Sequence, residues 1–107
     1  MEVGDYVRTK KGIIGKIKAI DNQTELEDLY LVKRRWYYKE DIIKSSLNII
    51  DLIEVGDYVD RLRVVDKEED YIVVETFDER IIIYKQDTIK SIVTKEQFER
   101  MEYKCTN

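Results

Sequence analysis

The sequence predicts an all-β protein of two tandem units, with five short strands in each, packed into one compact body with a short C-terminal helix. The hexapeptide Glu-Val-Gly-Asp-Tyr-Val occurs at residues 2–7 and again at 54–59. Isoleucine and valine supply 25 of the 107 residues, and β-branched side chains suit the pleated surface of a sheet. A unit of about 50 residues is marginally stable alone. We therefore expect the two units, residues 1–52 and 53–107, to pack together.

A second repeated segment supports the division into two units. The residues Tyr-Lys-Glu-Asp-Ile-Ile-Lys-Ser at 38–45 match Tyr-Lys-Gln-Asp-Thr-Ile-Lys-Ser at 84–91, which is an offset of 46. The hexapeptide recurs at an offset of 52. The second unit is therefore six residues shorter between its two anchors, and this predicts a trimmed hairpin loop.

The first unit is expected to form strands near residues 5–9, 13–20, 28–33, 36–39 and 42–50. Turn-forming residues separate the early strands, namely Lys10-Lys11-Gly12 and Asp21-Asn22-Gln23-Thr24. These boundaries predict an antiparallel arrangement with short connections.

The second unit is expected to form strands near residues 57–65, 70–77, 80–85 and 88–93, with turns at 67–69 and 77–79. Apolar and polar residues alternate over 71–76, whereas 81–84 is apolar on both faces. The run Thr94-Lys95-Glu96-Gln97 is typical of a capping box, with Phe98 and Met101 at helical spacing after it. It predicts the C-terminal helix.

The opening of the first unit resembles that of small SH3-like barrels of the KOW type. There Val3-Gly4-Asp5-Tyr6-Val7 is followed by Gly12-Ile13-Ile14-Gly15-Lys16-Ile17, and glycines allow the second strand to bend. The second unit has Arg61-Leu62-Arg63 where these glycines would lie, so its barrel is expected to be more open. The shared residues Val3, Tyr6, Val7, Val55, Tyr58 and Val59 are assigned to the core and to barrel closure.

Over residues 40–103 the chain is also similar to small uncharacterised proteins carried by phages and prophages of Gram-positive bacteria. The segments that carry this resemblance are Ile-Ile-Asp-Leu-Ile-Glu-Val-Gly-Asp-Tyr-Val at 49–59 and Ile-Lys-Ser-Ile-Val-Thr-Lys-Glu-Gln-Phe-Glu at 89–99. The resemblance implies a mobile-element setting. Small acidic proteins there often bind host machinery, as anti-CRISPR inhibitors do.

Composition argues against catalysis. The chain has no histidine, so Ser-His and Cys-His nucleophile pairs and HExxH zinc sites are excluded. Its one cysteine, Cys105, lies two residues from the end. The acidic run 66–70 lacks the central glycine and the twelfth-position glutamate of a calcium loop. We predict no catalytic residue, no cofactor and no metal. No apolar run approaches a membrane span and no signal-peptide pattern opens the chain, so a cytoplasmic location in the bacterial host cell is expected.

The candidate binding residues are Lys33, Arg34, Arg35 and Tyr37, within the basic and aromatic run at 33–38. Tryptophan, tyrosine and arginine are enriched at binding hot spots. The offset of 46 aligns Trp36 and Tyr38 with Ile82 and Tyr84, which predicts that these pairs face inward and that Arg35 and Tyr37 face outward. The alternative to a binding surface is that Trp36 and Tyr38 are only core residues and that the basic residues beside them are ordinary solvent-exposed side chains.

Charge is divided unevenly and suggests a second candidate surface. Residues 1–52 hold 10 basic and 9 acidic side chains, whereas residues 53–107 hold 9 basic and 14 acidic. An acidic second unit suits a basic partner surface, such as a nucleic-acid-binding groove. Its turns carry the secondary candidates Glu68, Glu69, Asp70, Asp78 and Glu79.

Two functions remain open from the sequence. In the first, the protein is a non-enzymatic, phage-type inhibitor that binds a host protein, such as a defence nuclease that acts on nucleic acid. In the second, it is a small RNA- or ribosome-associated KOW-like module. A net charge of −4 favours the first, and the basic-aromatic run favours the second. The sequence also does not decide whether exposed Ile81 and Ile83 form the interface of a homodimer.

Overall fold

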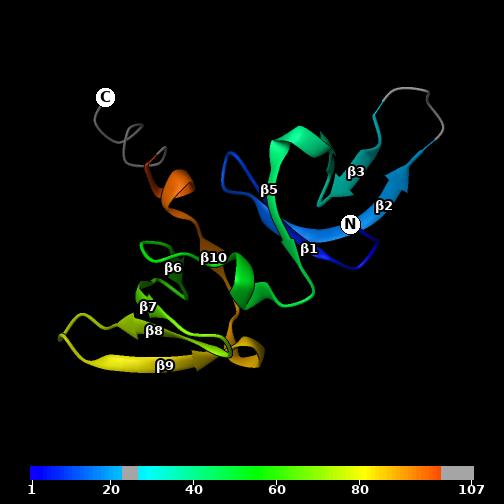
Figure 1. Cartoon of the computed structure of the whole chain (residues 1–107). Helices are drawn as coiled ribbons and strands as arrows, with labels where there is room; N and C mark the ends of the chain where they lie inside the picture. The colour runs from blue at the N-terminus through cyan, green and yellow to red at the C-terminus, as the bar shows by residue number, and fades with distance from the viewer. Residues whose placement is uncertain (23–26, 100–107) are drawn as a thin grey trace.

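The computed structural model describes residues 1–22 and 27–99, and its elements form two antiparallel sheets of five strands each. Figure 1 shows the sheets side by side, the first in blue to teal and the second in green to orange. The predicted all-β fold is confirmed. Within the described residues the edge strands of each sheet do not pair with one another, so both sheets are open rather than closed barrels.

The first sheet has the strand order β4-β3-β2-β1-β5. Its strands are β1 (Tyr6–Thr9), β2 (Ile14–Asp21), β3 (Leu29–Val32), β4 (Arg35–Tyr38) and β5 (Ile42–Ser46), with the short 3-10 helix η1 (Lys39–Asp41) before β5. A second 3-10 helix, η2 (Ile49–Leu52), leads to the second sheet. The expected strand at 42–50 therefore ends at Ser46.

The second sheet has the order β10-β6-β7-β8-β9. Its strands are β6 (Tyr58–Val59), β7 (Leu62–Lys67), β8 (Tyr71–Glu75), β9 (Ile81–Lys85) and β10 (Ile92–Val93), with η3 (Gln86–Thr88) after β9. The expected strand at 88–93 is thus reduced to its last two residues. No helix within residues 1–22 and 27–99 has the length and apolarity needed to cross a membrane.

The single strand expected at 57–65 is wrong, because a tight turn divides it into β6 and β7. Asp60 and Arg61 adopt left-handed backbone angles, with φ of 49° and 71°. Two such residues form the hairpin turn that matches the twist of adjacent strands. Asp60 is also tied to the chain before β10, since its Oδ1 accepts the N–H groups of Lys90 (3.0 Å) and Ser91 (2.7 Å). These bonds offset the cost of the turn.

The predicted C-terminal helix begins after Thr94 and covers residues 95–99 of the described chain. Thr94 N–H donates to Gln97 Oε1 (3.0 Å) and Gln97 N–H donates to Thr94 Oγ1 (3.4 Å), which confirms the capping box. Phe98 stacks on Tyr58 of β6 with ring centroids 4.6 Å apart. Other predicted features, involving Gln23, Thr24, Met101 and Cys105, lie outside the described residues.

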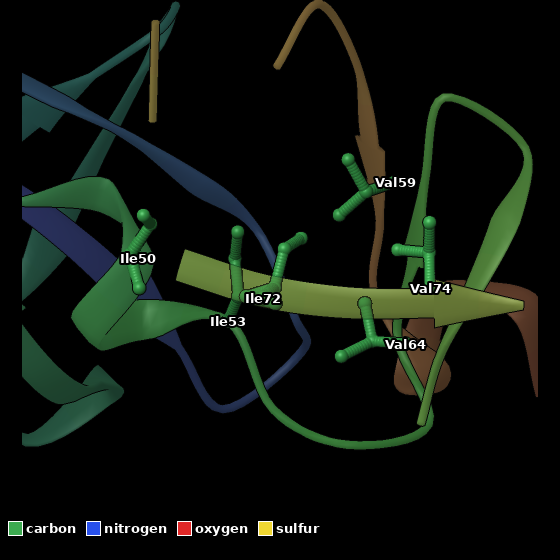
Figure 2. Packing of buried hydrophobic residues seen from close by; sticks show 6 residues of the cluster. All are labelled: Ile50, Ile53, Val59, Val64, Ile72 and Val74. Atoms are coloured by element: carbon green, nitrogen blue, oxygen red, sulfur yellow. The ribbon is translucent and has the colours of Figure 1, made fainter. Parts of the chain in front are cut away.

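Each sheet has its own cluster of buried hydrophobic residues. The first core contains Val7, Ile17, Tyr30 and Val32. Figure 2 shows the second core, in which Ile50 and Ile53 from the η2 region lie beside Ile72 of β8; its other buried members are Val59, Val64 and Val74. The connection between the sheets is therefore part of the second core and holds the sheets close together.

The repeated hexapeptide occupies the same place in both sheets. Gly4 N–H donates to Ile17 O (2.9 Å), and Gly56 N–H donates to Val64 O (3.0 Å). Of the shared side chains, Val7 and Val59 are fully buried, and Tyr6 and Tyr58 are partly buried. The assignment of Val3 and Val55 to the core is wrong, because both are exposed.

A buried ion-pair network joins the two sheets. Arg8 of β1 is fully buried, and its guanidinium forms two parallel bonds with the fully buried Asp57 (Nη1–Oδ2 2.5 Å and Nη2–Oδ1 3.0 Å). It also donates to Leu52 O (2.9 Å) and Glu96 Oε2 (2.7 Å), and its Nε lies 3.6 Å from Glu54 Oε2. Arg8 thus contacts the connection between the sheets, the residue before β6 and the C-terminal helix.

A candidate partner-binding surface

The pairing of β3 with β4 shows on which face of the first sheet each predicted binding residue of β4 lies. Val32 pairs with Arg35, and Tyr30 pairs with Tyr37. Directly opposed residues share a face of the sheet. Tyr30 and Val32 are buried in the first core, so Arg35 and Tyr37 lie on the core face, and Tyr37 packs against that core.

Trp36 and Tyr38 lie on the opposite, outer face. They are 46% and 49% exposed, respectively. The prediction that these two side chains face inward, with Tyr37 outward, is therefore wrong. Arg35, likewise predicted to face outward, lies on the core face; it is nevertheless exposed, because β4 is an edge strand and its first residue lies at the rim of the core.

The error comes from a one-residue shift in the alignment of the two halves. The 3-10 helix begins at Lys39 in the first half and at Gln86 in the second, which is an offset of 47 rather than 46. The last strands agree, since Ser45 pairs with Val7 and Ile92 pairs with Val59. A shift of one residue moves every side chain of a strand to the other face. In the structure Tyr84, which packs against the second core, corresponds to Tyr37.

A depression of about 300 Å³ lies between β4 and the turn that follows β1. Its lining combines cationic and aromatic side chains, Lys10, Lys11, Arg35, Trp36, Tyr37 and Tyr38. Asp41 holds the two sides together, because its carbonyl accepts Lys10 N–H (2.9 Å) and its Oδ2 accepts Tyr38 N–H (3.3 Å). We call this feature the aromatic-basic depression.

The other two predicted residues, Lys33 and Arg34, form the hairpin turn and do not line the depression. Both are exposed, and Lys33 has a left-handed backbone with φ of 58°. Gly15 of β2 lies beneath the side chain of Lys33, since a Cβ added at Gly15 would lie 3.3 Å from Lys33 Cγ and 3.0 Å from Val32 Cγ1. Lys33 therefore has a packing role as well as a charge.

The acidic candidates do not form one surface. Glu68, Glu69 and Asp70 are exposed in the turn before β8, whereas Asp78 and Glu79 lie in the turn after it. A strand of this length separates the two groups by about 16 Å. Asp78 is also paired, since its Oδ2 lies 3.1 Å from Arg80 Nε. The structure therefore brings no five-carboxylate patch together.

Sequence reasoning missed the most strongly perturbed carboxylate, Glu54. A hydrogen bond from Lys95 and the charge of Arg8 lower the pKa of Glu54 to about 2, against the opposing effect of burial. Lys95 Nζ lies 2.8 Å and Lys44 Nζ 3.3 Å from this carboxylate. These contacts are structural ion pairs between the sheets. Among the described residues, no three acidic or cysteine side chains gather as a metal site would require.

Comparison with known proteins gives no match for this chain, whether protein families, characterised sequences or solved structures are compared.

Proposed function

We propose that this chain is a non-enzymatic binding protein and that the aromatic-basic depression is its contact surface. The observation that carries the proposal is the exposure of Trp36 and Tyr38 (46% and 49%) beside Lys10, Lys11 and Arg35. Large exposed aromatic side chains next to arginine are the composition of binding hot spots. A concave setting allows a partner to bury both rings fully.

The partner class that fits this surface best is a protein. The whole chain carries a net charge of −4, which opposes non-specific binding to phosphates. Rings and an arginine at a depression fit an apolar anchor with an acidic rim on the partner. In the phage setting that the sequence resemblance implies, the partner is a host protein and the function is inhibition of a defence nuclease.

A second candidate, single-stranded RNA, is favoured by one specific feature of the depression. Lys10, Lys11 and Arg35 surround Trp36 and Tyr38, so cations lie beside two rings on which bases could stack. Single-strand-binding proteins combine the same two elements. This would be the KOW-like module of the alternative function.

We also propose that the two sheets are diverged copies of one SH3-like unit. Three features support this: the common strand order, a 3-10 helix before the last strand of each sheet, and equivalent hydrogen bonds at Gly4 and Gly56. In this proposal the first copy carries the contact surface, because its edge strand has the exposed rings.

The test compares the wild type with the double variant Trp36→Ala, Tyr38→Ala. Each protein is immobilised, exposed to nuclease-treated bacterial lysate, and the retained protein is identified and titrated. Hot-spot aromatics typically cost about 2 kcal/mol or more on truncation, so the double variant should bind its protein partner more than about tenfold more weakly. Both changes are on the outer face, so the melting temperature should be nearly unchanged.

Leu47→Ala is the matched control, because Leu47 is 77% exposed and lies outside the depression. It should bind like the wild type. A fluorescent oligouridine tests the second candidate, for which the same double variant should lose binding. Normal binding of both partner classes by the double variant would show that the contact surface lies elsewhere.

A further inference from the structure

Strand β9 is the free edge of the second sheet. It pairs with β8 on one side, and in Figure 1 it runs in yellow along the outer margin; within residues 1–22 and 27–99 no strand pairs with its other side. Thr76 N–H donates to Arg80 O (2.8 Å) in register with the β8–β9 pairs. Hydrogen-bonded pairs alternate along an antiparallel ladder. The backbone groups of Ile82 therefore point to β8, and those of Ile81 and Ile83 point to the free edge.

This edge differs from the other three in lacking protection against pairing. Proteins usually shield edge strands by shortness, charge, proline or a bulge. Strand β10 has two residues, and β4 and β5 contain Arg35 and Lys44, respectively. Strand β9 has five residues, and its only charge is the terminal Lys85.

Both faces of β9 are apolar as well as exposed. Ile81 and Ile83 are 68% and 60% exposed on the outer face, and Ile82 is 41% exposed at the rim of the second core. A strand joined to this edge would cover apolar side chains on both faces at once. The same strand would satisfy the free backbone groups.

We propose that β9 pairs with β9 of a second copy of this chain, antiparallel and centred on Ile82, to form a two-fold dimer. This inference is independent of the proposed function. In this register Ile81 faces Ile83 of the second copy, and symmetry repeats the contact. Each of these two pairs can exchange two backbone hydrogen bonds, because their free groups point to the edge. The four outer isoleucines form one apolar cluster.

The charges at the ends of the strand support a second copy as the occupant. The register centred on Ile82 brings the turn residue Glu79, just before β9, to the end of the strand near Lys85 of the second copy, and symmetry makes this pair twice. A closed two-fold interface must be self-complementary in this way. A register centred on Ile83 would instead bring Glu79 opposite Asp87, which are like charges.

The experiment is sedimentation velocity of the full chain from micromolar to near-millimolar concentration. The wild type should shift from monomer to dimer, and Ile83→Lys should remain monomeric throughout. Ile43→Lys is the matched control, because Ile43 is an exposed isoleucine (46%) in a strand of the other sheet, and it should dimerise like the wild type.

Charge reversal tests the register. Lys85→Glu turns two attractive pairs into repulsive ones and should raise the dimer Kd roughly tenfold, while the double variant Glu79→Lys, Lys85→Glu should restore it. A wild type that stays monomeric at every concentration overturns the proposal, as does a dimer that Ile83→Lys leaves intact. A double variant as weak as Lys85→Glu alone overturns the register. Trp36→Ala, Tyr38→Ala should dimerise normally, so failure of this inference is distinguishable from failure of the proposed function.

Discussion

At the scale of single residues, Arg8 determines how the two sheets are joined. Asp57 accepts two hydrogen bonds from Arg8 and two backbone N–H groups, from Glu54 (2.8 Å) and Lys95 (2.9 Å). Replacing a buried ion pair by apolar residues is often neutral, but removing one partner leaves a buried charge uncompensated. The network is therefore sensitive to loss of Arg8 alone.

Arg8→Ala should lower the free energy of unfolding by about 3–5 kcal/mol, because the carboxylate of Asp57 would stay buried without its cation. Arg80→Ala is the control, since Arg80 forms an exposed pair with Asp78 and should cost less than about 1 kcal/mol. Urea unfolding followed by circular dichroism measures both. Equal costs for the two variants would show that the buried pair contributes no more than a surface pair.

The sequence could not reveal this network. Asp57 and Asp5 occupy the same position of the repeated hexapeptide, and each accepts the N–H three residues before it, from Glu54 and Glu2. Asp5 is partly exposed, whereas Asp57 is fully buried. The difference arises from Arg8, which is 49 residues away along the chain. Local patterns specify the turn but carry no information about such a distant partner.

At the scale of elements, the presence of the strands could be predicted from the sequence, but which side chains of β4 face the core could not. Alternating and β-branched runs located both sheets, and the Thr94–Gln97 pattern located the helix start. The predicted faces of β4 came from an alignment of the two halves by residue identity. That alignment differs by one residue from the alignment that the strand pairing gives. Side chains alternate, so that small error exchanged the core-facing Tyr37 with its outward neighbours.

The faces of β4 predict that two double variants differ in stability. Arg35→Ala, Tyr37→Ala should lower the melting temperature, because Tyr37 packs against the first core and its partial burial is worth roughly 2 kcal/mol. Trp36→Ala, Tyr38→Ala should leave it nearly unchanged. Differential scanning calorimetry distinguishes the two. The reverse order of melting temperatures would place Trp36 and Tyr38 in the core.

Gly12 links the turn after β1 to the start of the helix. The carbonyl of Gly12 accepts a hydrogen bond from the Thr94 hydroxyl (2.8 Å). A Cβ added at Gly12 would lie 2.1 Å from Thr94 Oγ1. Gly12→Ala should therefore destabilise the protein by several kcal/mol, through backbone strain at φ of 86° and loss of this contact. The change is measured by chemical unfolding.

Gly4→Ala is the matched control for this prediction. Gly4 has a similar φ of 98°, but a Cβ there would meet no atom within 4 Å. It should cost only the backbone strain, about 1–2 kcal/mol. If Gly12→Ala costs no more than Gly4→Ala, the contact with Thr94 contributes nothing to the joining of the sheets.

At the scale of the whole molecule, the two cores are joined by the η2 connection, whose Ile50 and Ile53 belong to the second core, and by a network of ion pairs. Glu54 lies at the centre of this junction, because it pairs with Lys44 of β5 in the first sheet and with Lys95 at the start of the C-terminal helix. Its side chain is 24% exposed, so these contacts are partly shielded from water. The stability of the molecule should therefore depend on the ionisation of Glu54.

The pKa of Glu54 falls from 4.5 to about 2 in the folded protein, chiefly through the Lys95 hydrogen bond. A carboxyl group whose folded pKa is lowered stabilises the folded state above its unfolded pKa, and this contribution is lost as the pH falls through the folded pKa. Because the paired lysine side chains are each 43% exposed, solvent screening reduces the stabilisation to about 1–2 kcal/mol. At pH 7 Glu54→Gln should therefore be less stable than the wild type by about this amount. The difference between the two proteins should shrink between pH 4.5 and 2 and vanish below it, as followed by urea unfolding at each pH. A difference that stayed constant across this range would mean that Glu54 acts through packing rather than through the charge that links the two sheets.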